Sequence, residues 1–306
     1  SGAGTAILFL TRGRDLVALG SGNSFFPGIL VLDHLSAIFF FLVNAIGLLA
    51  VWYGPKYIAN EKGHYRLSHI QFLTAFFLLG MQMVTLGTTP VFFLFAWEIM
   101  SFSSFFLVFA DGKKASIRPA IFYLMMTHLG AGAILAGFLI LSQGTVHVDF
   151  SQLALSAARL PAPALFAAFV LFFFGFGSKA GLFPFHGWLP EAHPQAPSHI
   201  SALMSGVMLK IAVYGFLRVT LFILPSVSFT WGAAVVVIGL FSAIFGVLYS
   251  ITETDIKRIL AFSSIENLGL IFAMIGVSFA AKNLGMDVLA EMSMLSIFCP
   301  SRVNTE

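Results

Sequence analysis

Long apolar stretches separated by short polar connections run through most of the 306-residue sequence. A helix needs about 20 mostly apolar residues to cross a bilayer whose hydrocarbon core is about 30 Å thick. About eight segments meet or nearly meet that length, at roughly 29–53, 68–87, 90–110, 119–142, 162–187, 198–222, 229–250 and 256–279. The runs are too long for strands and show no alternation, which argues against a sheet or a β-barrel. The pattern predicts an all-α, polytopic transmembrane helix bundle.

Composition supports lipid as the surrounding solvent. Hydrophobic residues make up 58% of the chain and charged residues only 9%, whereas a soluble domain carries about 25% charged residues. The net charge of +3 gives no reason to expect a nucleic-acid partner. The single cysteine, Cys299, can neither close an internal disulfide nor hold an iron–sulfur cluster alone. We therefore expect no cofactor in this chain and any redox chemistry on partner subunits.

Basic residues are distributed unevenly between the two sets of connections. One set carries Lys56, Lys62, Arg66, Lys113, Lys114, Arg118, Lys257 and Arg258, and the other mainly Arg12, Arg14, Arg159 and Arg218. By the positive-inside rule the first set faces the cytoplasm. We expect a multi-pass protein of the inner (cytoplasmic) membrane.

The fifth apolar segment contains helix-breaking residues near its end. Gly181, Pro184 and Pro190 fall within G-L-F-P-F-H-G-W-L-P. Proline removes a backbone donor and clashes with the preceding turn. Broken backbone at membrane depth is tolerated only beside protein or a water-filled cavity, and such breaks line transport sites. The motif predicts a broken helix at a functional site.

Ionisable residues interrupt several of the predicted spans, namely Glu98, His128, Lys179, His199, Lys210 and Glu266. Each charge at the bilayer centre costs about 2.5–3.5 kcal/mol on insertion scales, so such residues are functional by default. His199 and Lys210 lie eleven residues apart, close to three α-helical turns, and we expect them to share one helix face. Burial disfavours a charged amine and a nearby carboxylate favours it, so a change in the Glu98–Lys179 separation would load or release a proton. These residues predict a proton relay.

Structural interpretations stand beside this one. Glu98 and Lys179 could form an ion pair that only holds helices together, and His128 could make an interhelical hydrogen bond. His186, His193 and His199 surround the break, but no fourth ligand has the spacing of a zinc site. Asp33, His34, Lys257 and Arg258 lie near helix ends, where snorkelling to the interface explains them.

Three motifs carry a resemblance to a known family. They are W-E-I-M-S-F-S-S, the stretch G-F-G-S-K-A-G-L-F-P-F-H-G-W-L-P-E-A-H-P-Q-A-P-S-H-I-S-A-L-M-S-G-V-M-L-K, and T-D-I-K-R-I-L-A-F-S-S-I-E-N-L-G. The chain resembles the antiporter-like membrane subunits of complex I, Mrp antiporters and membrane-bound hydrogenases over about residues 29–279. Within that family it is most similar to the hydrogenase-4 component B and formate hydrogenlyase subunit 3 branch.

The resemblance implies an inverted-repeat fold in which each repeat has a broken helix. It places Glu98 at the family's key glutamate, Lys179 at the broken-helix lysine, Lys210 at the central-axis lysine and His199 at the histidine of the hydrogenase-like branch. It also implies other membrane subunits and a peripheral hydrogenase or dehydrogenase arm, whose iron–sulfur and nickel–iron centres drive proton movement. The chain itself would be an ion-translocating subunit without a catalytic centre.

The two ends of the sequence differ from that pattern. Ala6–Leu10 read like the end of an earlier helix, and no signal peptide is visible, so we expect a fragment. We divide the chain into an antiporter-like domain at 1–279, with the first repeat complete and the second begun, and a truncated or aberrant tail at 280–306. The second broken helix that the resemblance implies does not follow in this tail. Two alternatives to a proton-translocating subunit stay open, an Mrp-type sodium/proton antiporter subunit and a non-transporting membrane scaffold.

Overall fold

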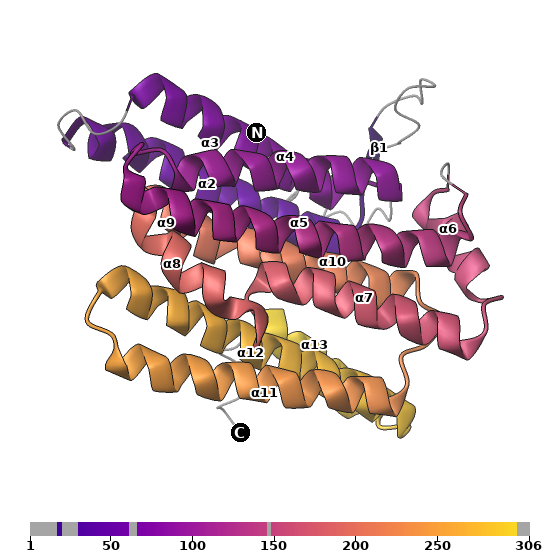
Figure 1. The fold of residues 1–306 in the computed structure, drawn as a ribbon. Helices are drawn as coiled ribbons and strands as arrows, with labels where there is room; N and C mark the ends of the chain where they lie inside the picture. Colours follow the sequence, from indigo (N-terminus) through magenta and orange to yellow (C-terminus); the bar gives the residue numbers. More distant parts are fainter. Residues whose placement is uncertain (1–16, 20–29, 61–65, 146–147, 299–306) are drawn as a thin grey trace.

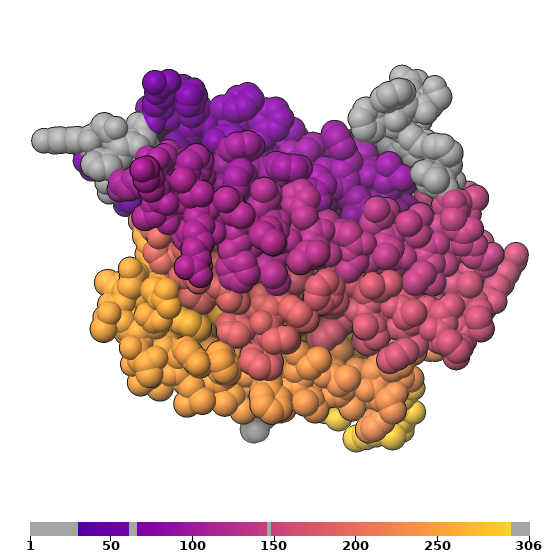
Figure 2. Space-filling view, in the orientation of Figure 1, coloured from indigo at the N-terminus to yellow at the C-terminus, as the bar shows by residue number. Residues whose placement is uncertain are grey.

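The computed structural model describes residues 17–19, 30–60, 66–145 and 148–298. The predicted helix remnant at Ala6–Leu10, Arg12, Arg14, Lys62 and Cys299 lie outside these ranges. Long helices run roughly side by side across the molecule, with the N-terminal helices at the top of the view and the C-terminal helices at the bottom (Figure 1). In the space-filling view the N-terminal, middle and C-terminal helices form successive bands (Figure 2).

Two short strands and a series of helices make up the described ranges. The strands β1 (Val17–Leu19) and β2 (Leu30–Leu32) pair antiparallel. The helices are α2 (His34–Asn60), α3 (Leu67–Leu86), α4 (Pro90–Val108), α5 (Lys114–Ser142), α6 (Phe150–Ala157), α7 (Ala162–Ala180), α8 (Trp188–Gln195), α9 (Ser198–Leu203), α10 (Leu209–Phe222), α11 (Phe229–Thr252), α12 (Ile256–Asn283) and α13 (Asp287–Phe298). A 3₁₀ turn, η1 (Phe185–Gly187), precedes α8, and a π-helical turn, η2 (Met204–Met208), joins α9 to α10.

Eight of the described helical segments are long and apolar enough to cross a membrane. They match the eight predicted spans, which confirms the all-α, polytopic fold class. Large apolar side chains cover the outside of the bundle, including Leu48 at 71% exposure and Trp52 at 81%. Such a surface fits hydrocarbon, because lipid tails are as apolar as the side chains that face them. The chain is a multi-pass membrane protein.

The break after α7 lies at the predicted position. Gly181 ends the helix in the left-handed conformation, with φ +76°, where a Cβ atom would be strained. Pro184 and η1 then lead into α8, in which Pro190 occupies the first turn. The backbone amide of Phe183, which lies just after the end of α7, donates a hydrogen bond to Ser242 Oγ of α11 at 2.9 Å. A side chain of a neighbouring helix therefore supplies a hydrogen-bond partner for this amide at the break.

Helices α11 and α12 pack closely against each other. A Cβ built on Gly239 would lie 2.6 Å from the backbone of α12, at Ala273 N and Gly269 O. Gly232, Gly246 and Gly276 make contacts of the same kind. Small residues allow membrane helices to approach closely enough for strong van der Waals packing. The 12-residue helix α13 then follows α12 and is too short to count among the candidate spans.

Candidate functional site

A lysine lies in the middle of the bundle and donates to two hydroxyl groups. Lys179, in the last turn of α7, is 1% exposed. Its Nζ donates to Ser101 Oγ of α4 at 3.0 Å and to Tyr123 OH of α5 at 2.7 Å. It also lies 4.8 Å from the centre of the Tyr123 ring. The amine is thus shared between three helices.

The end of α7 fixes where this amine points. Trp188, the first residue of α8, donates from Nε1 to Ser178 O at 2.8 Å. The same indole lies against the Tyr123 ring, with centroids 4.8 Å apart. The residues after the break therefore fold back over the last turn of α7 and hold Lys179 against Tyr123.

Tyr123 extends the cluster beyond the lysine. Its hydroxyl is 2.6 Å from Ser104 Oγ and donates to Met208 Sδ at 3.4 Å. Tyr123 and Ser104 are fully buried. Buried polar groups of this kind are normally satisfied within a network. Met208 belongs to η2, so the network reaches the segment that precedes Lys210.

The predicted carboxylate, Glu98, lies on the outer side of the cluster. Its Oε2 is 3.3 Å from Nε2 of His128, and the two side chains are 31% and 41% exposed. The other ring nitrogen of His128 lies 3.0 Å from Leu124 O. Each ring nitrogen of His128 thus lies near an oxygen atom. Glu98 also lines an apolar side pocket between α3 and α4, together with Phe72, Phe95 and Phe102.

The structure does not join Glu98 to Lys179 directly. Among the described residues no ion pair within 4.0 Å links the two side chains. Ser101, three residues after Glu98 on the same helix, accepts a hydrogen bond from the Lys179 amine instead. Helix geometry places residues three apart on the same face. Glu98 and Ser101 therefore lie on the same side of α4, and of the two only Ser101 is within hydrogen-bond distance of the Lys179 amine among the described contacts.

Lys210 borders a cavity of about 480 Å³ that is lined mainly by residues of α9, η2 and α12. Its Nζ donates to Ser205 O at 3.0 Å. The cavity is lined by His193, Ser198, Ser201, Ala202, Ser205, Gly206, Lys210, Ile256, Lys257, Leu260, Ser263, Ser264 and Asn267. Most of these residues belong to α9, η2 and α12 and carry hydroxyl, amide, imidazole or amine groups. The cavity is large and polar enough to hold several water molecules.

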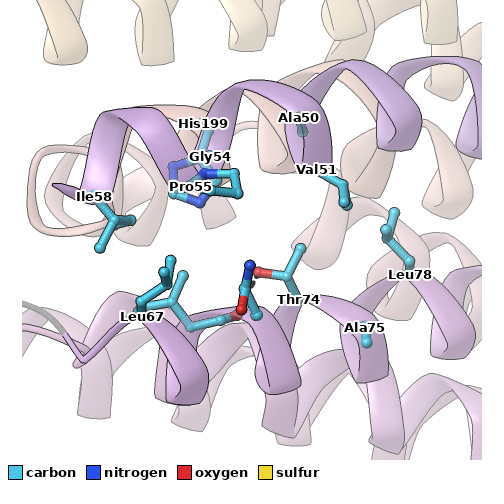
Figure 3. Close-up of a pocket in the computed structure, with 12 residues that line it drawn as sticks. Ala50, Val51, Gly54, Pro55, Ile58, Leu67, Thr74, Ala75, Leu78 and His199 are labelled. Atoms are coloured by element: carbon cyan, nitrogen blue, oxygen red, sulfur yellow. Dashed lines mark hydrogen bonds between the residues drawn. The ribbon is translucent and has the colours of Figure 1, made fainter.

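His199 does not line the cavity of Lys210, contrary to the shared face predicted from their spacing. It lines a separate, mostly apolar slot of about 210 Å³ between α2 and α3. Figure 3 shows the His199 ring beside Gly54 and Pro55, above the gap that α3 closes from below. The reason is η2: a π turn bonds residue i to i+5, which adds a residue to the turn and rotates everything after it. The spacing rule assumed an uninterrupted α-helix.

Glu266 does not line the Lys210 cavity.

 The backbone of Glu266 meets Gly246 of α11, where an added Cβ would lie 2.6 Å from Glu266 N. Its neighbours Ser263 and Asn267 face the Lys210 cavity instead. Of the three histidines around the break, His186 lies among Phe183 and Phe245. Within the described ranges, no three His, Cys, Asp or Glu side chains gather closely enough to bind a metal ion.

Sequence reasoning missed several members of these clusters. Tyr123 and Ser104 look like ordinary residues of an apolar helix, and nothing in their local sequence marks them as partners of Lys179. His193 was considered from the sequence only as a possible zinc ligand; it is 2% exposed, and its Nε2, at the Lys210 cavity, has no hydrogen-bond partner among the described residues. The available signal was the rarity of polar side chains at membrane depth.

Known proteins share both the sequence pattern and the fold. A family described as NADH:quinone oxidoreductase/Mrp antiporter, transmembrane, matches residues 88–301. Hydrogenase-4 component B of Escherichia coli is 37% identical over 266 residues, covering 86% of this chain and 39% of that protein. The Na(+)/H(+) antiporter subunit A1 of Staphylococcus haemolyticus is 34% identical over 251 residues, covering 81% of this chain and 30% of that protein.

A solved archaeal respiratory complex, the membrane-bound sulfane sulfur reductase, contains a chain of the same fold, with a TM-score of 0.81 at 19% identity. That match covers 97% of this chain and 62% of the other. The chain thus spans well under half the length of the two curated relatives above. The family match covers most of the chain and extends from α4 beyond α12, through the Lys179 and Lys210 clusters. The chain therefore belongs to the NADH:quinone oxidoreductase/Mrp antiporter transmembrane family.

Proposed function

We propose that the chain moves protons across the inner membrane, as a membrane subunit of a respiratory hydrogenase or formate hydrogenlyase-like complex related to NADH-quinone oxidoreductase. The observation that carries the proposal is the buried amine of Lys179, which is hydrogen-bonded to two hydroxyl groups. Such a group is costly in a purely structural bundle, and its burial and neighbours can be changed to load or release a proton. Similarity to hydrogenase-4 component B favours the hydrogenase setting.

The proposed relay has an outer and an inner part. Glu98 and His128 form the outer part, which exchanges a proton with Lys179 by way of Ser101. Tyr123 then connects Lys179 to η2, and Lys210 receives the proton at its polar cavity. Since the thioether of Met208 cannot carry a proton, the step across η2 requires a water molecule between Tyr123 OH and Lys210. We also assign His199 and Glu266 to the relay, at positions outside the Lys210 cavity.

Other subunits complete the proposed assembly. The redox energy would come from a peripheral hydrogenase or dehydrogenase arm that holds iron–sulfur and nickel–iron centres. The basic residues Lys56, Lys113 and Lys114 favour a cytoplasmic location for the end of the bundle that carries them, by the positive-inside rule. The apolar pocket around Glu98 gives this carboxylate a lateral opening toward a neighbouring membrane subunit.

The test is Lys179→Ala in the complete complex, reconstituted in liposomes and driven by its redox substrate. We expect proton pumping to be lost while the complex still assembles. The exposed residue Lys114 offers a matched control, and Lys114→Ala should pump normally. Undiminished pumping by an assembled Lys179→Ala complex would leave only the scaffold function.

A sodium/proton antiporter subunit is the second candidate, because the antiporter subunit A1 is 34% identical to this chain. Varying sodium at fixed pH in the same liposomes separates the two. Proton movement that is independent of sodium supports the hydrogenase-type function. Coupled sodium counterflow would replace it with the antiporter function.

A further inference from the structure

The apolar slot between α2 and α3 lies where α2 ends and α3 begins, at the end of the bundle that carries the basic connections. Its walls are residues between Ala50 and Ile58 of α2, residues between Leu67 and Leu78 of α3, and His199. Figure 3 shows the two helices facing each other across the slot, with Leu67 at one end and Leu78 at the other. Apart from His199, the slot shares no residue with the proposed relay.

The shape of the slot fits an extended hydrocarbon chain. Leu67 and Leu78 are eleven residues apart on α3, which corresponds to about 16 Å along the helix axis. The slot closes at its inner end, because α2 and α3 meet there: a Cβ added to Gly47 would lie 2.7 Å from Leu78 Cδ2. A helix is about 10–12 Å in diameter. A slot of about 210 Å³ therefore admits one acyl chain and excludes a transmembrane helix of a partner subunit.

Polar side chains interrupt the apolar walls at three places. The hydroxyl of Thr74 is satisfied within its own helix, where it donates to Ile70 O at 2.6 Å. Gln71 lies about 6 Å along α3 from Leu67, near the outer end of the slot. His199 is 5% exposed, and its Nδ1 has no hydrogen-bond partner among the described residues. A phospholipid carries its ester groups between the headgroup and the acyl chains, so its polarity along this slot matches that of the walls.

The outer end of the slot is basic. Arg66 is exposed and directly precedes α3, and its side chain makes no cap hydrogen bond to that helix. The sequence from 56 to 69 carries Lys56, Lys62 and Arg66 against a single acidic residue, Glu61. The first turn of α3 has no acidic residue, so the partial positive charge of this helix end adds to the basic side chains. Basic pockets of this kind between membrane helices attract anionic lipid headgroups.

We propose that the slot binds one anionic phospholipid of the phosphatidylglycerol class, with an acyl chain between α2 and α3 and its phosphate at Arg66. The chain fills the space where the two helices separate, and the headgroup offsets the positive charge at the outer end. A zwitterionic lipid has the same chain but lacks the matching net charge. This inference goes beyond the proposed function and holds or fails independently of the relay.

The test is photocrosslinking of the complete complex in liposomes that contain a small fraction of phosphatidylglycerol or phosphatidylcholine with a diazirine on one acyl chain. Mass spectrometry of the peptides then locates the adducts. The phosphatidylglycerol probe should label the slot residues of α2 and α3 about tenfold more than the phosphatidylcholine probe. Arg66→Gln should lower this preference about fivefold, the effect of one basic side chain near an anionic lipid. Arg159→Gln, at an exposed arginine far from the slot in sequence, should leave it unchanged.

A second variant fills the slot itself. Ala75 is an exposed residue of the slot wall, and Ala75→Trp should abolish labelling of the slot by the phosphatidylglycerol probe. Ala167→Trp, at an exposed alanine of α7, should keep that labelling. If Ala75→Trp fails to assemble, the surface variant Arg66→Gln still decides the question.

Three outcomes overturn the inference. Equal labelling of the slot by both probes would mean ordinary boundary lipid without charge selection. Labelling that survives Ala75→Trp would place the lipid outside the slot. Slot residues that stay unlabelled, while the outer face of α7 around Ala167 is labelled, would show that no lipid enters. Redox-driven pumping by Lys179→Ala tests the relay separately.

Discussion

The Lys179 amine lies 2.7 Å from the Tyr123 hydroxyl oxygen, in a part of the bundle where both side chains are buried. The two residues come from helices α7 and α5, and the hydroxyl also contacts Ser104 and Met208. This contact links the broken helix to the π turn before Lys210. In the proposed relay, the Tyr123 hydroxyl is therefore the group that connects Lys179 to η2.

Tyr123→Phe should lower redox-driven pumping by about tenfold while the complex still assembles. The ring keeps its packing against Trp188, but Lys179 loses a hydrogen-bond partner, and an unsatisfied buried donor costs about 1–3 kcal/mol. Pumping is measured in reconstituted liposomes. Tyr249→Phe is the matched control, since that tyrosine is 45% exposed on α11. Equal pumping by the two variants would remove Tyr123 from the relay.

Lys179→Arg should abolish pumping although it keeps the positive charge. The guanidinium does not release its proton near neutral pH, whereas a lysine amine can. The measurement compares pumping and assembly in Lys179→Arg and Lys179→Ala. A purely electrostatic or structural role predicts that arginine restores function relative to alanine. Restored pumping would therefore contradict the relay.

Asp33 gives the fold a defined dependence on acid. Its partial burial raises the pKa of the carboxyl, but the hydrogen bond and charge of Arg218 outweigh this and hold the pKa below its ordinary value. A carboxyl with a lowered pKa in the folded state contributes stability above its unfolded pKa, about 3.9, and loses it as the pH falls through the folded pKa. Asp33→Asn should therefore flatten the stability curve below about pH 4.

Stability against urea in detergent, measured from pH 6 down to pH 3, checks this expectation. The conservative Asp111→Asn exchange serves as the comparison, because Asp111 forms its 3.7 Å ion pair with an exposed lysine outside the spans. We expect only the Asp33 variant to change the acid limb of the curve. Identical curves for wild type and Asp33→Asn would show that the pair with Arg218 adds no pH-dependent stability.

Gly239→Leu should separate α11 from α12. Even the first carbon of the new side chain would lie 2.6 Å from the α12 backbone, which cannot move aside as a flexible side chain would. Overpacking of this type costs about 1–3 kcal/mol or more. Thermal unfolding in detergent should show a lower midpoint for this variant. Gly132→Leu, at a glycine with open space around it, should leave the midpoint nearly unchanged.

Much of the fold could be predicted from local sequence. The eight spans follow from the length and apolarity of each run, and these properties do not depend on neighbouring helices. The break at Gly181 and Pro184 was also visible, because glycine and proline act on their own backbone. The presence of Glu98, Lys179 and Lys210 at membrane depth marked them as candidates without any knowledge of their partners.

The partners of those residues could not be predicted in the same way. Tyr123 meets Lys179 only because α5 and α7 pack with particular faces together. The pairing of Asp33 with Arg218 joins residues 185 positions apart. The π turn η2 sends His199 and Lys210 to different cavities, although an ideal helix would align them.

The sequence by itself therefore determined that this protein is a bundle of membrane-spanning helices with a broken helix and buried ionisable groups. Hydrophobic length and backbone breaks are properties of short segments, so they can be read along the chain. Only the tertiary structure decided which hydroxyl, carboxylate or cavity each buried charge meets. Those contacts depend on the rotation and spacing of helices that are distant in sequence, and a single added residue in one turn is enough to change them.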